Sequence, residues 1–213
     1  MTAPIGLLGG TFDPIHLGHL RIALEVMEAL SFQEGRFIPA ASPPHRPDPV
    51  LGIPERVRLL EAALTDQPGF VLDTRELARP GPSYMVDTLL DLRRELGDAQ
   101  PLCLILGMDA FSLLPSWHRW EELSELTHVV VASRPGGAQR PEGAWWRGRV
   151  FMDPSQLAAS PAGGAYFHRV TAMEISSARL RQLIQQGHSP RYLVPDAVWR
   201  MIGQEHWYQP HEQ

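Results

Sequence analysis

Apolar residues along this chain occur in short continuous runs that alternate with longer segments of helical spacing. The runs LCLILG (102–107) and HVVVASR (128–134) are typical of strands that are buried on both faces. Shorter runs of the same kind come earlier in the chain. The pattern predicts strands at 4–8, 36–40, 70–74, 102–107 and 128–134.

The segments between these runs carry apolar residues three and four positions apart. In LGHLRIALEVMEAL, for example, Leu20, Ala23 and Met27 share one face, which indicates an amphipathic helix. Ser83 is a candidate N-cap for a later helix of the same kind. We expect helices at 17–30, 54–66, 83–96, 109–117, 119–126, 175–187 and 195–206.

Strands that alternate with helices predict an α/β fold, a Rossmann-like doubly wound parallel sheet with helices on both faces. Residues 136–165 lack periodicity, and we expect a loop there in which 149–152 is the candidate strand. The length of 213 residues suits one domain, 1–213, with a small C-terminal helical part from about residue 172. Ligands of such sheets bind at the carboxyl ends of the strands.

Composition narrows the classes of partner. The net charge of −5 provides no general basic field, so we expect no nucleic-acid partner and favour small molecules. The single cysteine, Cys103, lies in an apolar run and allows no internal disulfide. Proteins without disulfides are typical of the reducing cytoplasm, which is the location we expect. We expect no signal peptide, because MTAPIGLLGG lacks the basic start and long apolar run of one. We expect no membrane partner, because no apolar run is long enough to span a bilayer. Association of copies into a homo-oligomer stays open.

The stretch GGTFDPIHLGHLR (9–21) carries the first candidate chemistry. It lies where a predicted strand ends and a helix begins, so backbone amides beside Gly9 and Gly10 could approach an anion closely. His16 and His19 are one helical turn apart and could face the same phosphate, with Gly18 leaving space between them. Imidazoles donate hydrogen bonds to phosphate best when they are protonated.

Simpler interpretations of this stretch stay open. A glycine pair at a strand end is usually a turn, and two histidines at this spacing are often a surface pair or part of a metal site. A zinc site is disfavoured because the chain has no HExxH motif and its cysteine lies in a strand. A dinucleotide-binding loop is disfavoured because the glycines do not follow G-x-G-x-x-G.

A second helix start strengthens the phosphate hypothesis. EISSARLR places Ser176 and Ser177 at a helix N-terminus, with Arg179 and Arg181 in the next turn. Hydroxyls, free amides and guanidinium groups all bind phosphate. The alternative is an ordinary serine N-cap followed by solvated arginines. Two such features in one α/β chain favour a phosphate site.

The two stretches resemble signatures of the HxGH nucleotidyltransferases, GGTFDPIHLGH the first motif and ISSARLR the ISSTxIR motif. Further segments extend the resemblance to the bacterial nicotinate-mononucleotide adenylyltransferases over nearly the whole chain, least in 137–165. These segments are PPHR (43–46), SYMVDT (83–88), LGMDAFSLLPSWHRW (106–120), SRPG (133–136) and YLVPDAVWRMI (192–202).

The resemblance implies a reaction in which ATP and nicotinate mononucleotide give deamido-NAD and pyrophosphate. The acceptor phosphate would attack the α-phosphorus of ATP directly, so catalysis needs positioning and charge stabilisation rather than an enzyme nucleophile. Mg²⁺ would be carried mainly by the ATP phosphates and water, because the sequence has no dense carboxylate cluster. Asp13, followed by Pro14, is expected to be structural.

The resemblance also implies which residues hold ATP. His16, His19 and Arg181 would be catalytic, with the histidines at the transferred phosphoryl group. Asp109 would bind a ribose hydroxyl unless it is a helix N-cap, and Arg134 would lie near the adenine unless it is a surface residue. The further ATP-binding residues would be Gly9, Gly10, Thr11, Phe12, Gly107, Ser176 and Ser177.

The acceptor side is implied in the same way. His45 and Arg46 would bind the mononucleotide phosphate, and Trp117 would stack on the pyridine ring, whereas Trp120 is expected in the core. The remaining acceptor-binding residues would be Tyr84, Met85 and Asp87. Helix-terminal amides could bind the nicotinate carboxylate without a dedicated arginine.

Two positions depart from the family pattern, because Ala178 and Met85 stand where threonine is expected. A lost hydroxyl near the nicotinate would reduce selectivity for the acid over the amide. Nicotinamide mononucleotide is therefore an alternative acceptor. Phosphopantetheine is another, because adenylyltransferases that act on it share the first motif, and a non-catalytic nucleotide sensor is the alternative outside enzymes.

Overall fold

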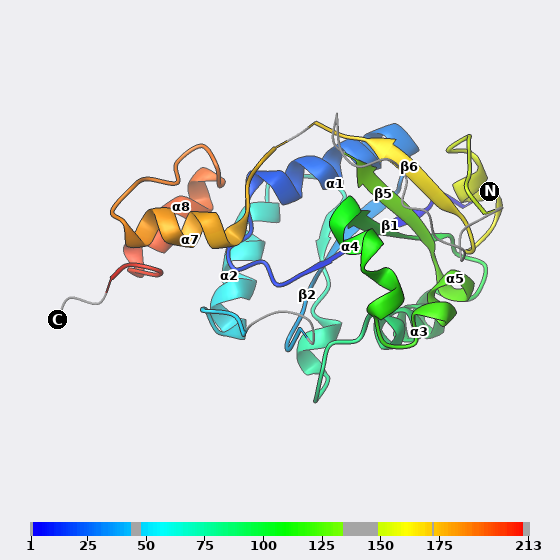
Figure 1. The fold of residues 1–213 in the computed structure, drawn as a ribbon, viewed down its shortest axis with the longest axis horizontal. Helices are drawn as coiled ribbons and strands as arrows, with labels where there is room; N and C mark the ends of the chain where they lie inside the picture. The colour runs from blue at the N-terminus through cyan, green and yellow to red at the C-terminus, as the bar shows by residue number, and fades with distance from the viewer. Residues whose placement is uncertain (1, 44–47, 134–148, 172, 211–213) are drawn as a thin grey trace.

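The computed structural model describes residues 2–43, 48–133, 149–171 and 173–210, and Figure 1 shows its arrangement. One sheet of six parallel strands has the order β3-β2-β1-β4-β5-β6, which is the doubly wound order expected from the sequence. The strands are β1 (Ile5–Gly10), β2 (Glu34–Pro39), β3 (Phe70–Leu72), β4 (Leu102–Gly107), β5 (His128–Ser133) and β6 (Ala165–Arg169).

Helices connect the strands and extend beyond the last one. The longer helices are α1 (Leu17–Leu30), α2 (Ile53–Leu64), α3 (Met85–Leu96), α7 (Ser177–Gln185) and α8 (Asp196–Gln204). The short ones are α4 (Met108–Ser112), α5 (Leu123–Leu126), α6 (Gln156–Ala159), and the 3₁₀ turns η1 (Arg75–Ala78), η2 (Leu114–Ser116) and η3 (Trp120–Glu122). Within the described residues, no helix is both long and apolar enough to span a membrane.

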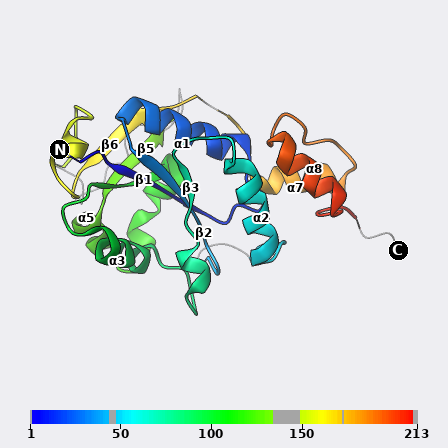
Figure 2. The same ribbon diagram turned by 180° about the vertical axis from the view of Figure 1, so that it is seen from behind.

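Both faces of the sheet are covered because the buried strands are apolar on both sides. Leu104 points to the face that α3 and α5 cover, whereas its neighbour Cys103 points to the face that α1 covers. Figures 1 and 2 show α1 on one side of the sheet and α3 with α5 on the other. Cys103 is fully buried and reduced, so its assignment to the core is confirmed.

The C-terminal helices α7 and α8 pack beside the sheet rather than on it. In Figures 1 and 2, α2 lies between them and the strands. Leu180 and Val198 share a buried cluster with Leu59 and Leu60 of α2 and with Phe12 just after β1. This packing brings the last part of the chain against the loop that follows the first strand.

Three local expectations differ from the structure. Ser83 is not the N-cap of α3, which begins at Met85, because its hydroxyl accepts hydrogen bonds from the amides of Ala41 and Ser42 instead. The helix expected at 109–117 divides into α4 and η2, because Pro115 has no N–H to continue the ladder.

The candidate strand at 149–152 is also wrong. Val150 forms only an isolated bridge to Ala165, and the sixth strand is β6, within a segment of mixed polarity. An edge strand is only partly buried, so it lacks the continuous apolar run that marks β4 and β5. The pattern of apolar residues likewise did not predict the helix α6 or the turn η1.

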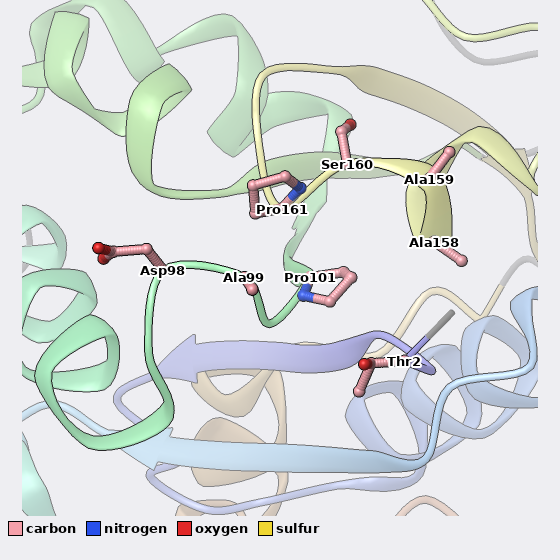
Figure 3. A pocket seen from close by; sticks show the side chains of 8 residues that line it. All are labelled: Thr2, Asp98, Ala99, Pro101, Ala158, Ala159, Ser160 and Pro161. Carbon is pink, nitrogen blue, oxygen red and sulfur yellow. The ribbon is translucent and has the colours of Figure 1, made fainter.

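The amino edge of the sheet has a surface cavity of about 590 Å³ that Figure 3 shows from close by. Its lining residues are Thr2, Asp98, Ala99, Pro101, Ala158, Ala159, Ser160 and Pro161. Asp98 is the one ionisable side chain among them. This edge therefore offers little chemistry and lies opposite the carboxyl ends of the strands.

A buried arginine holds the loops at this amino edge. Arg93 is only 8% exposed, and its guanidinium donates to the carbonyls of Leu126 (2.6 Å), Gln100 (2.5 Å), Pro161 (2.9 Å) and Gly97 (3.2 Å). These acceptors belong to the ends of α3 and α5 and to the connections before β4 and β6. One side chain thus satisfies four carbonyls from three segments: the α3–β4 connection, the end of α5 and the connection before β6.

We expect Arg93→Met to lower the free energy of unfolding by about 3 kcal/mol, because it leaves several buried carbonyls without a donor. Its neighbour Arg94 is the matched control, since its side chain is 74% exposed and pairs only with Asp91 on the same helix. Arg94→Met should change the free energy by less than about 1 kcal/mol. Urea denaturation of the three proteins measures both values, and equal losses would contradict the role of Arg93.

Candidate functional site

The sheet changes its winding direction between β1 and β4, and this is the place where doubly wound folds bind ligands. The two strands pair from Ile5 to Leu7 and from Leu102 to Leu104, so their last residues extend beyond the pairing. Gly10 ends β1 and Gly107 ends β4. The first loop, residues 11–16, leads from there into α1.

Two glycines of the first motif are required by close neighbours. A Cβ on Gly18 would lie 3.0 Å from Nδ1 of His16, so the glycine lets this ring lie over the first turn of α1. A Cβ on Gly9 would lie 2.9 Å from Cε of Met85, which places the predicted acceptor residue Met85 against the end of β1. A Cβ on Gly10 would lie 3.0 Å from Cζ of Phe12.

The histidines of this motif lie side by side, as their spacing of one helical turn allows. The rings of His16 and His19 are stacked with centroids 3.6 Å apart and an interplanar angle of 23°. Phe12, which has a positive φ of 51° and is buried, meets the ring of His19 edge-on at 5.1 Å. His16 is 4% exposed, whereas His19 is half-buried. The pair therefore has one enclosed and one more accessible ring.

The enclosed ring is uncharged at neutral pH. Burial lowers the pKa of His16 from 6.5 to about 4, because the charged form loses its hydration. Its buried Nδ1 has no hydrogen-bond partner among the described residues.

The start of α7 lies against the first loop. Ser176 is the N-cap of α7, as predicted, and its hydroxyl accepts a hydrogen bond from the amide of Arg179. Ser177 donates to the carbonyl of Pro14 at 2.9 Å, and Nη1 of Arg181 donates to the carbonyl of Asp13 at 2.6 Å. Tertiary packing thus joins the two motifs that suggested a phosphate site.

The buried carboxylate of Asp13 holds this arrangement together. It accepts hydrogen bonds from the amides of Val50 (2.7 Å) and Leu51 (3.3 Å) and from the hydroxyl of Tyr208 (2.6 Å). Its Oδ2 also lies 3.5 Å from Nη1 of Arg181. The expectation that Asp13 is structural is confirmed.

Sequence reasoning missed Arg56, which supports the same loop from α2. Arg56 is 1% exposed and donates from Nη1 to the carbonyl of Thr11 at 2.8 Å. Burial lowers its pKa, and the nearby carboxylate of Asp13 opposes that shift. Its position was a usable signal, because Arg56 lies at helical spacing with Leu59 and Leu60 on the buried face of α2.

The predicted acceptor residues form a second group. The rings of Tyr84 and His118 lie 4.2 Å apart at 31°, and Asp87 lies 3.5 Å from Nη1 of Arg119. These contacts join the start of α3 to the segment that follows η2. Trp117, in that segment, is partly buried against the core of this face, as is Trp120. Sequence reasoning did not identify His118 as part of this group.

The remaining predicted residues are placed only in part. Asp109 is exposed in the first turn of α4, whose N-cap is Gly107, so the alternative that Asp109 is an N-cap is wrong. Asp109 and Gly107 lie at the carboxyl end of β4, next to β1. His45, Arg46 and Arg134 lie outside the described residues.

The described residues suit phosphate better than a protein-held metal. No group of three or more His, Cys, Asp or Glu side chains in the described ranges could hold a metal ion. Asp13, the carboxylate of the first loop, already accepts three hydrogen bonds. The first loop and α7 instead present imidazole, hydroxyl, amide and guanidinium donors.

Comparisons with known proteins agree with this arrangement. A family model described as cytidylyltransferase-like matches residues 7–183. A probable nicotinate-nucleotide adenylyltransferase of Methylococcus capsulatus is 52% identical over 208 residues, covering 96% of this chain and 99% of the relative. A protein of the same description from Halorhodospira halophila is 50% identical, covering 96% and 94%.

Solved structures show the same fold at low identity. The Plasmodium falciparum nicotinic acid mononucleotide adenylyltransferase complexed with NaAD matches with a TM-score of 0.73 and 15% identity, covering 97% of both chains. Its complex with APC matches with a TM-score of 0.70, also at 15% identity. The likeness covers the C-terminal helices as well as the sheet.

The depressed pKa of His16 predicts a loss of stability in acid. Between pH 6.5 and about 4 the unfolded chain binds a proton that the folded chain excludes, so the free energy of unfolding falls as the pH falls through this window. The contribution of His16 is about 3 kcal/mol. Denaturation at several pH values should give a flatter profile for His16→Gln than for the unmodified protein.

His188 is the matched control for this experiment, because it is exposed at the end of α7. His188→Gln should keep the full acid dependence. A profile for His16→Gln as steep as that of the control would contradict an uncharged, buried His16.

Proposed function

This chain belongs to the nicotinate-nucleotide adenylyltransferases of the cytidylyltransferase-like family, and we propose that it transfers the adenylyl group of ATP to nicotinate mononucleotide. The products are nicotinate adenine dinucleotide and pyrophosphate, a step of NAD biosynthesis. The single structural observation that carries the proposal is the stacked His16–His19 pair beside the start of α7 at the switch point of the sheet.

The reaction is a direct displacement at the α-phosphorus. A phosphate oxygen of the acceptor forms the new bond while the bond to the bridging oxygen of the β-phosphate breaks, and pyrophosphate leaves with that electron pair. No covalent enzyme intermediate is required. The residues contribute position and charge, which are the main sources of catalysis in phosphoryl transfer.

The proposed roles follow from where the side chains lie. His19, the more accessible ring, binds the oxygens of the transferred phosphoryl group, and His16 holds it in place from the enclosed side. The amides at Gly9, Gly10 and Thr11 contribute further donors at the end of β1. An approaching triphosphate would favour protonation of the pair, since an anion stabilises imidazolium.

Arg181 and the start of α7 bind the departing pyrophosphate. The guanidinium is partly exposed and lies over the first loop, where it contacts the Asp13 carbonyl. The backbone amides of the first turn and the O–H of Ser176 add donors at the positive end of a nine-residue helix, while Ser177 fixes that end against Pro14. Charge that develops on the leaving group therefore meets a cation and a helix N-terminus.

Mg²⁺ would enter with ATP in this scheme. It supplies charge neutralisation on the phosphate oxygens and keeps mostly phosphate and water ligands, as Mg²⁺ does in many nucleotide sites. The donors around the first loop fit a metal–phosphate complex because they bind phosphate oxygens rather than the metal.

The acceptor lies on the side of α3 and the segment after η2. Trp117 provides the aromatic platform for the pyridine ring, with Tyr84, Met85 and Asp87 beside it and His45 and Arg46 for the phosphate. The contact of Met85 with Gly9 supports this placement, because it brings the acceptor side next to the end of β1. Asp109 binds the ribose of ATP and Arg134 lies near the adenine.

The proposal is tested by pyrophosphate release from Mg-ATP with nicotinate mononucleotide, nicotinamide mononucleotide or phosphopantetheine as the acceptor. We expect a kcat/KM for nicotinate mononucleotide at least about tenfold above that for the amide. Comparable rates with both pyridine nucleotides would show that Met85 permits dual specificity. No release with any of the three would contradict the proposed reaction.

His19→Ala should lower kcat by at least about a hundredfold while the affinity for ATP changes by less than about fivefold. The reason is that this ring is assigned to charge that develops in the transition state. Steady-state kinetics and equilibrium titration with a non-hydrolysable ATP analogue separate the two quantities. The exposed His188→Ala is the control, and weaker ATP binding with unchanged kcat in His19→Ala would contradict the assignment.

A further inference from the structure

The C-terminal end of the described chain contacts the first loop through one buried tyrosine. Tyr208 is 6% exposed, and its hydroxyl donates to Oδ1 of Asp13 at 2.6 Å, across 195 residues of sequence. It has a positive φ of 63°, which is uncommon for a residue with a side chain. Burial strongly raises the pKa of Tyr208, so the phenol remains a donor across the physiological range.

The acceptor of this bond is nearly saturated. A carboxylate has about four lone-pair positions. The amides of Leu51 and Val50 and the hydroxyl of Tyr208 occupy three positions on Asp13. Arg181 faces the fourth from 3.5 Å and makes its shorter contact, 2.6 Å, with the main-chain carbonyl of the same residue. Asp13 therefore attracts Arg181 only weakly through its carboxylate.

We propose that Tyr208 is a positioning residue for the reaction, acting through Asp13 on Arg181. By donating to Oδ1, its hydroxyl offsets part of the negative charge of the carboxylate and so weakens the attraction of Oδ2 for the guanidinium, which leaves Arg181 available to the phosphates of ATP. The inference rests on the proposed function, in which Arg181 binds the leaving pyrophosphate.

The structure also gives the direction of the effect. Without the hydroxyl, Asp13 has a free lone pair and a stronger charge toward its remaining neighbours, because one charge-assisted hydrogen bond is lost. Arg181 is the partly exposed cation that already lies 3.5 Å from Oδ2, so the stronger charge draws it closer to that oxygen, whereas Arg56 is fully buried and is bonded to Thr11. The guanidinium then binds Asp13 at the expense of the phosphates.

The experiment compares Tyr208→Phe with the unmodified enzyme under the assay for pyrophosphate release. We expect the KM for ATP to rise about tenfold and the KM for nicotinate mononucleotide to change by less than twofold, as for the loss of a hydrogen bond to a charged group. Melting temperatures are measured in parallel. A lower melting temperature with unchanged kinetics would show a purely structural role and overturn the inference.

A control separates Tyr208 from the C-terminal segment as a whole. Glu205 forms an exposed ion pair with Arg58, which also lies 5.3 Å over the ring of Trp207. Glu205→Gln weakens the attachment of the segment without touching Asp13, so its kinetics should match those of the unmodified enzyme. A rise in the KM for ATP equal to that of Tyr208→Phe would contradict the inference.

Coupling to Arg181 provides the decisive comparison. If Tyr208 acts through Arg181, then Tyr208→Phe should have no further effect on the KM for ATP in an Arg181→Ala background, whereas independent effects would multiply. Multiplied effects would overturn the inference. An unmodified enzyme that releases no pyrophosphate would instead contradict the proposed function, so the two failures are distinguishable.

A second variant tests the hydrogen bond of Tyr208 without changing the packing of its ring. Replacement of Tyr208 by 3-fluorotyrosine preserves the shape of the ring and makes the phenol a stronger donor. It should lower the KM for ATP about twofold, opposite to Tyr208→Phe. An unchanged or higher KM for ATP with this substitution would overturn the inference.

Discussion

The buried carboxylate of Asp13 is the interaction on which the site depends. A carboxylate can be buried only when hydrogen bonds replace its hydration. Those bonds come from the segment before α2 and from the C-terminal end, and Arg181 of α7 lies beside it. The first loop is thereby held from three directions. Its position, and with it the position of His16, follows from satisfying one buried charge.

The same burial shapes the chemistry of the histidine pair. Close packing around Gly18 lets His16 lie almost without exposure over the helix start, and the lost hydration keeps that ring uncharged. His19, stacked on it, stays accessible. If the loop exposed the ring of His16 to water, burial would no longer lower its pKa. His16 is thus uncharged before ATP binds. In the proposed reaction, the negative charge of the bound triphosphate would favour protonation of the histidine pair.

The two edges of the sheet divide stability from function. At the amino edge, Arg93 donates to four carbonyls of three segments, and His128 bridges the carbonyl of Ser160 and the amide of Gly164. Burial lowers the pKa of His128, so it remains a neutral structural group. The carboxyl edge carries the partly exposed His19 and Arg181 beside the start of α7. Polar groups that are fully satisfied hold the fold, and those that are not are available to a ligand.

The sequence by itself determined the doubly wound sheet, the helices α1, α2, α3, α7 and α8, and the two motifs from which we propose a phosphate site, because each depends on local periodicity or on short spacing. It also placed Cys103 in the core and Ser176 at a helix start. Only the tertiary structure decided that Ser83 binds the backbone at Ala41 rather than capping α3, and that β6 is the edge strand. The partners of Arg56 and Tyr208 were likewise beyond local patterns, since they lie 45 and 195 residues away, although the spacing of Arg56 with Leu59 and Leu60 did indicate its burial.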